Sequence, residues 1–191
     1  MEPNEKTQSR EDILVELVKI DQAITAMFEE TPAEKIFAKH GPKWSPAENL
    51  EHLIRSIVPF TKGLQMPKTV LKLSFGKAAN PSRSYVEIVK TYKAALEKGV
   101  EARGRYLPDS GSSAFDDSAK NELVQSWKSA EEEMGKMIAK WSETDLDKYR
   151  LPHPVLGKLT VREMLFFMLY HNFHHKLAID ARLEEMNATK S

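Results

Sequence analysis

The sequence of 191 residues contains no cysteine, and this absence removes several kinds of site. Disulfide bonds and thiolate metal ligands are excluded, so any reactive thiol must arrive with a substrate. The sequence also lacks an excess of either charge, because Lys+Arg and Asp+Glu both number 28. With a net charge of zero, there is no electrostatic reason to expect nucleic acid or an anionic membrane as a partner.

Long hydrophobic runs are missing as well. No apolar run approaches the roughly 18–20 residues that cross a membrane, and residues 1–12 are charged, without the apolar segment of a signal peptide. A cytoplasmic protein is therefore the default expectation. Hydrophobic residues make up 41% of the chain, enough for a sizeable core, and the length favours one domain over residues 1–191.

Apolar residues recur at three- and four-residue spacing in four long segments, which predicts four amphipathic helices. The first ends at Thr31-Pro32. The second begins at the capping box Ser45-Pro46-Ala47-Glu48, and we expect Pro59 to kink or end it. The third covers about residues 117–141, with its lysines and glutamates on a solvated face, and the last runs from Thr160 to about Arg182.

The segment between the second and third long helices is roughly fifty residues long, far beyond a hairpin loop. A shorter helix is predicted from Ser84, closed by Gly104, whereas residues 66–83 receive no assignment. Residues 151–157 are predicted to be a rigid extended link, and no segment alternates like a strand. The prediction is an all-α four-helix bundle in up-down-down-up order, with a long crossover that carries the extra helix.

Seven apolar or aromatic residues, Met164 to Tyr170, lead directly into His171, His174 and His175. Such a run predicts a helix that is buried nearly all round. His171 and His175 are four residues apart and therefore share one face. A lone histidine on an apolar face is usually a core residue, but two buried imidazoles need partners for both rings. A divalent metal would bind one nitrogen of each.

His52 is the natural third ligand because it is the one other histidine on a predicted apolar helix face. We expect His40 and His153 to be exposed in turns beside prolines, and His174 to lie a step round the helix. Three imidazoles suit zinc, nickel or copper better than magnesium or calcium. Three protein ligands also leave a fourth position open for water or substrate, as in catalytic sites.

Other residues near these histidines have weaker assignments. Asn49 and Ser56 lie one turn either side of His52, where they could orient its ring. Trp44 precedes the second helix and could pack as a hydrophobic staple or line a pocket. Met168 is expected to be a packing residue that could also line the pocket, and Trp127 and Trp141 are expected in the core.

Three stretches together resemble the DinB/YfiT-like superfamily. Trp44–Leu53 resembles its W-[ST]-x-x-E-x-x-x-H-[LI] start of the second helix. His153–Glu163, with its His-Pro, Gly, Leu-Thr and Glu, resembles the entry to the last helix. His171–His175 matches the H-x-x-x-H of that helix, and the resemblance extends over roughly residues 10–185 in element order.

The resemblance implies a four-helix bundle with one metal ion, often zinc or nickel, on His52, His171 and His175. Relatives of this kind transfer low-molecular-weight thiols such as bacillithiol or mycothiol, or isomerise and hydrolyse small molecules, and many form dimers. The leading hypothesis is thiol transfer to a small electrophile. The alternatives are a metal-dependent hydrolase of a small amide or ester and a non-catalytic metal- or ligand-binding stress protein. A homodimer is compatible with the neutral charge and with the resemblance.

Overall fold

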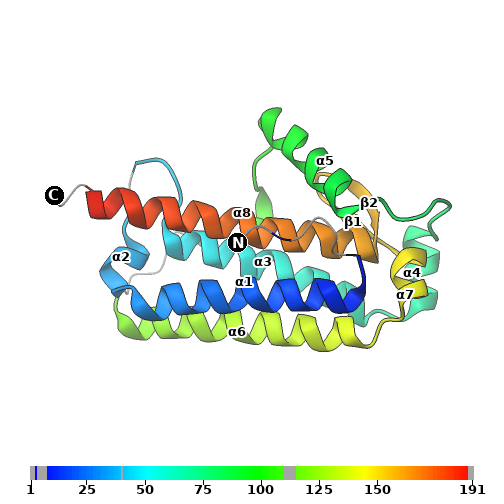
Figure 1. Ribbon diagram of the computed structural model, residues 1–191, viewed down its shortest axis with the longest axis horizontal. Coiled ribbons are helices and arrows are strands. Elements are labelled where there is room, and N and C mark those ends of the chain that lie inside the picture. Colours follow the sequence, from blue (N-terminus) through cyan, green and yellow to red (C-terminus); the bar gives the residue numbers. More distant parts are fainter. Residues whose placement is uncertain (1–2, 4–7, 40, 110–114, 189–191) are drawn as a thin grey trace.

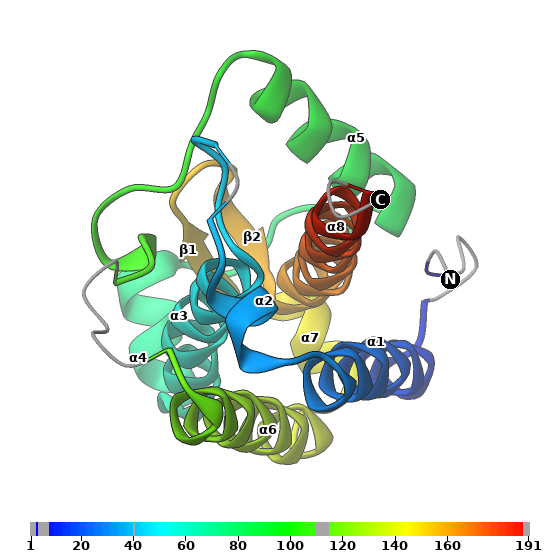
Figure 2. The same cartoon turned by 90° about the vertical axis from the view of Figure 1, so that its left-hand side faces the viewer.

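The computed structural model describes residues 3, 8–39, 41–109 and 115–188. Four long helices form a bundle: α1 (Arg10–Glu30), α3 (Pro46–Gln65), α6 (Asp117–Ala139) and α8 (Val161–Ala188). Each of α1 and α3 packs against both α6 and α8, as the view along the bundle shows (Figure 2). Helices α1 and α8 run in one direction and α3 and α6 in the other (Figure 1). The predicted all-α bundle with up-down-down-up order is confirmed.

The crossover between α3 and α6 carries more structure than expected. The unassigned residues 66–83 contain helix α4 (Lys68–Phe75), and the extra helix α5 (Tyr85–Glu97) leans away from the bundle (Figure 1). Helix α5 does not reach Gly104, because Gly99 adopts the left-handed conformation that ends helices. A 3-10 turn (Gly104–Tyr106) follows it. Two short helices, α2 (Ala33–Phe37) and α7 (Glu143–Lys148), were not expected either.

A two-stranded hairpin replaces the predicted extended link. Strands β1 (Arg150–His153) and β2 (Gly157–Thr160) pair antiparallel, with Leu151 opposite Leu159. Both leucines are buried, and Leu151 packs closely against Gly63 of α3. The expectation of an exposed His153 is wrong, because its ring packs edge-on against Phe167 at 4.2 Å and is buried. Four-residue strands are too short for an alternation pattern to reveal them.

Helix α3 does not end at Pro59 but continues to Gln65. A proline inside a helix removes one main-chain hydrogen bond. The buried side chains of Ile57, Phe60 and Leu64, on both sides of the proline, all belong to the core and offset that loss. Because the helix continues, its last turns pack against α6 and the hairpin.

Helix α8 is the centre of the molecule. Nearly every residue from Val161 to His175 is buried, because α1, α3, α5 and the hairpin all pack against it. This confirms the expectation of a helix buried on almost every side. The helix begins at a capping box: the Glu163 main-chain N–H donates to the Thr160 hydroxyl at 3.1 Å, and the Thr160 N–H donates to the Glu163 carboxylate at 2.9 Å. Arg83 pairs with that carboxylate at 2.8 Å and ties the crossover to the start of α8.

Candidate metal centre

Three histidines from two helices meet inside the bundle. His171 and His175 lie one turn apart on α8, and His52 lies on α3, the antiparallel neighbour of α8. The start of α3 is fixed by its own capping box, in which Ser45 and Glu48 exchange main-chain hydrogen bonds. Two helices with fixed starting points therefore bring together residues that are distant in the sequence.

The ring nitrogens of the three histidines converge. The Nε2 atoms of His52 and His171 are 3.1 Å apart, and one nitrogen from each ring lies within 4.8 Å of the others. Two nitrogens bound at 2.0–2.1 Å to one tetrahedral zinc ion are about 3.3 Å apart. The separation of the His52 and His171 nitrogens is thus already close to that of two ligands of one ion.

Hydrogen bonds determine which nitrogen of two rings is free. Nδ1 of His52 donates to the main-chain oxygen of Tyr106 at 2.6 Å, because a carbonyl can only accept. Nδ1 of His175 donates to Oδ1 of Asn49 at 2.8 Å. The Asn49 amide nitrogen donates to the main-chain oxygens of Trp44 and Ser45, which identifies the atom that faces His175 as the oxygen. Both neutral rings therefore present an unprotonated Nε2.

His171 differs from the other two. Its Nδ1 is buried without a hydrogen-bond partner among the described residues, and its Nε2 faces that of His52. Two unprotonated nitrogens at 3.1 Å repel each other unless one carries a proton or both bind a cation. A metal ion that bound all three Nε2 atoms would remove this conflict, so the donor set fits a metal.

Burial keeps the three rings neutral. It lowers the pKa of His52, and it lowers the pKa values of His171 and His175 well below the ordinary value, with a further contribution from the neighbouring imidazoles. Neutral imidazoles hold the lone pairs that a metal requires. In the described part of the chain, no carboxylate or fourth histidine joins this group. The three histidines could hold one metal ion and leave a position for a further ligand.

Aromatic rings surround the group. The Trp44 ring is centred 5.0 Å from that of His52 and 6.1 Å from that of His175. On the other side, Phe167 stacks on His171 at 4.9 Å, and Tyr92 of α5 meets it edge-on at 6.1 Å. Trp44 therefore lies against the rings of His52 and His175. Met168 is buried in the apolar core.

Asn49 and Ser56, which were predicted to orient the ring of His52, form their hydrogen bonds with other groups. Asn49 holds the ring of His175 rather than that of His52. The Ser56 hydroxyl donates to the main-chain oxygen of His52 at 2.9 Å, so its expected role at the ring is wrong. The group that orients His52 is the Tyr106 carbonyl, which the sequence could not reveal because any residue type carries one. Tyr92 and Phe167 were also missed, since their apolar spacing indicated only core packing.

The two other described histidines, His153 and His174, are not part of the group. His153 accepts hydrogen bonds at Nδ1 from the main-chain N–H groups of Val155 and Leu156, and burial lowers its pKa to about 4. His174 is only partly buried, with its ring 5.3 Å from that of His175, and burial lowers its pKa as well. His40 lies outside the described residues.

Comparisons with known proteins give one match. No curated protein and no solved structure matches the chain. Separately, no helix in the described residues is long and apolar enough to cross a membrane. The family model of the DinB superfamily matches residues 16–179, which include α3, the crossover and all three histidines. On that match, and with the bundle order already described, the chain belongs to the DinB superfamily.

Proposed function

We propose that the protein is a metal-dependent enzyme that transfers a low-molecular-weight thiol to a small electrophile, with zinc or nickel on His52, His171 and His175. The observation that carries the proposal is the group of three neutral imidazoles, of which two present an unprotonated Nε2 held by a hydrogen bond at Nδ1. When bound, the metal supplies the positive charge that converts a thiol into a thiolate.

The surroundings of the three histidines support thiol chemistry over hydrolysis. Trp44, Phe167 and Tyr92 border the group with aromatic rings, and no described carboxylate joins it to act as a base for water. Aromatic walls exclude water and give a soft sulfur atom and an apolar electrophile a favourable environment. The transfer forms one carbon–sulfur bond and breaks the bond from that carbon to its leaving group, while the thiol proton passes to solvent.

One observation favours hydrolysis of a small amide or ester as a second candidate. His174 lies beside His175 and is not part of the three-histidine group. Burial lowers its pKa, so it is neutral at physiological pH and able to accept a proton. In a hydrolase, His174 would be the general base.

The test uses the purified protein loaded with zinc or nickel. Loss of free thiol is measured with bacillithiol, mycothiol and glutathione in the presence of a haloaromatic electrophile, and ester cleavage is measured in parallel. We expect thiol transfer that His52→Ala abolishes and His174→Ala retains. Ester cleavage that needs both residues would instead identify a hydrolase. If the metal-loaded protein does neither, a binding protein remains and the proposal is refuted.

A further inference from the structure

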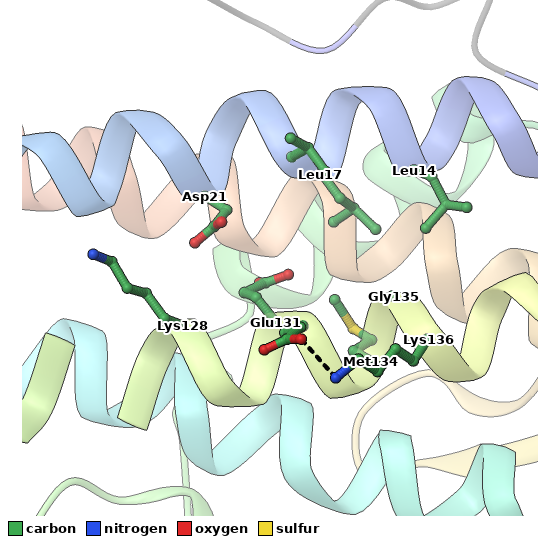
Figure 3. A pocket seen from close by; sticks show the side chains of 10 residues that line it. Leu14, Leu17, Asp21, Lys128, Glu131, Met134, Gly135 and Lys136 are labelled. Atoms are coloured by element: carbon green, nitrogen blue, oxygen red, sulfur yellow. Dashed lines mark ion pairs between the residues drawn. The ribbon is translucent and has the colours of Figure 1, made fainter. Parts of the chain in front are cut away.

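A cavity of about 260 Å³ opens between α1 and α6, with lining side chains from both helices (Figure 3). These two helices lie on the opposite side of the bundle from the hairpin and α5 (Figure 2). Leu14 and Leu17 of α1 and Met134 of α6 form much of its wall. The cavity does not include any of the three histidines, which lie between α3 and α8. It is therefore a second candidate site, independent of the proposed function.

Two carboxyl groups enter this cavity from opposite helices. Asp21 points from α1 toward α6, and Glu131 points from α6 toward α1 (Figure 3). Glu131 is only 8% exposed, and one of its oxygens accepts a hydrogen bond from the Asn172 amide at 2.7 Å. Burial and, to a lesser degree, the nearby Asp21 together raise its pKa to about 8, against the hydrogen bond from Asn172. Burial also raises the pKa of Asp21, against hydrogen bonds from Thr25 and Trp127 and the charge of Lys128.

The lysines around the cavity do not neutralise these acids. Lys128 pairs with Glu29 at 2.6 Å, and Lys136 pairs with Glu132 at 2.6 Å on the exposed side of α6. No described residue forms an ion pair with Asp21 or Glu131. The cavity thus combines an apolar wall with two carboxyl groups that have no ion-pair partner among the described residues.

We propose that this cavity binds a small organic cation, a primary amine with a short alkyl tail, between Asp21 and Glu131. An ammonium group has three donors and can bond to both carboxyls at once. The volume equals that of about eight or nine water molecules at roughly 30 Å³ each, enough for an amine of five or six carbon atoms. The leucines and Met134 favour an alkyl chain over a hydrated metal ion, which would keep its water shell.

The experiment is a calorimetric titration of the full-length protein with pentylamine at pH 7, in metal-free and metal-loaded forms. We expect saturable binding in both forms, and no comparable binding of 1-pentanol, which has the tail without the charge. Glu131→Gln and Asp21→Asn should each weaken pentylamine binding at least tenfold. Glu132→Gln is the matched control. Glu132 also lines the cavity but already pairs with Lys136, so this substitution should alter binding less than twofold.

A second readout follows from the protonation of Glu131. An ammonium ion beside this carboxyl favours its ionised form, so binding at pH 7 should release protons in the wild type and fewer in Glu131→Gln. Titrations in two buffers with different ionisation enthalpies count them. Circular dichroism confirms that the variants fold, since both substitutions keep the side-chain shape. Equal binding of 1-pentanol, displacement of pentylamine by magnesium, or an equal loss in Glu132→Gln would overturn the proposal.

Discussion

Asn49 offers a direct test of how the candidate metal centre is held. Its Oδ1 accepts a hydrogen bond from Nδ1 of His175 at 2.8 Å, and its amide nitrogen donates to the main-chain oxygens of Ser45 at 2.9 Å and Trp44 at 3.3 Å. One side chain therefore orients a ligand ring and closes the start of α3. We predict that Asn49→Ala weakens zinc binding and also lowers the stability of the metal-free protein.

The two effects have different sizes and can be separated. Loss of a hydrogen bond that orients a metal-binding histidine weakens metal binding about 10–100-fold, which corresponds to about 1.4–2.7 kcal/mol. The two bonds to the Trp44 and Ser45 carbonyls add to the stability of the fold, each by about 0.5–1.5 kcal/mol. Without them the Ser45 carbonyl still accepts the main-chain N–H of Asn49. Asn49→Asp keeps an acceptor for His175 but removes both donors. It should therefore retain zinc affinity while it loses stability.

Competition with a chromophoric chelator measures the zinc affinity, and urea unfolding of the metal-free protein measures the stability. Ser56→Ala is the control, because the Ser56 hydroxyl donates to the main-chain oxygen of His52 and has no recorded bond to its ring among the described residues. The zinc affinity of this variant should equal that of the wild type. If Asn49→Ala binds zinc as tightly as Ser56→Ala does, the hydrogen bond to His175 has no part in metal binding and the reasoning fails.

Four further predictions concern the metal ligands, the two buried titratable groups outside them, and assembly. His52→Ala should reduce the bound zinc as much as His171→Ala does, as measured by elemental analysis of the purified protein. The variants His40→Ala, His153→Ala and His174→Ala should retain their zinc. Equal loss of zinc in all five variants would contradict the assignment of the metal ligands. Burial lowers the pKa of His153 to about 4 from 6.5, so unfolding takes up a proton in that range and the free energy of unfolding should fall as the pH drops from about 6.5 to about 4. His153 contributes up to about 3 kcal/mol to this change in the free energy of unfolding. His153→Asn keeps an acceptor for the N–H groups of the hairpin turn, and urea unfolding of this variant should show a pH dependence that is smaller by that amount. For Glu131 the pH dependence of stability has the opposite sign. Its pKa is raised from 4.5 to about 8, so the free energy of unfolding should fall as the pH rises between these values. At pH 9, Glu131→Gln should therefore unfold at a higher urea concentration than the wild type. A homodimer is expected from the family resemblance, and sedimentation at micromolar concentrations that shows only monomer would exclude it.

Much of the fold could be predicted because local signals agree with tertiary packing. The capping boxes at Ser45, Ser84 and Thr160 all start helices in the structure. The four-residue spacing of His171 and His175 places both rings on one side of α8, and the long crossover leads to the predicted order of helices. In each case the decisive interaction is within a few residues of the signal, so the sequence alone contains it.

The wrong or missed predictions concern residues whose surroundings are formed by distant parts of the chain. Glu131 belongs to a run of three glutamates that suggested a solvated face, and it is buried because α1 and Asn172 of α8 cover it. His153 follows a proline and precedes another, which favours a turn, but Phe167 shields its ring. The Tyr106 carbonyl reaches His52 from 54 positions away. These contacts join distant parts of the chain through main-chain atoms or burial, which residue spacing does not encode.

The sequence distance between His52 and His171 has a consequence for how this cysteine-free chain resists unfolding. The two residues are 119 positions apart, yet their ring nitrogens lie 3.1 Å from each other. A metal ion held by both residues would act as a reversible cross-link and close a loop over more than half of the sequence. In the chain-entropy model, a covalent link over such a loop stabilises a fold by roughly 5 kcal/mol. Unlike a disulfide, such a cross-link would withstand reducing conditions and would be released by a chelator.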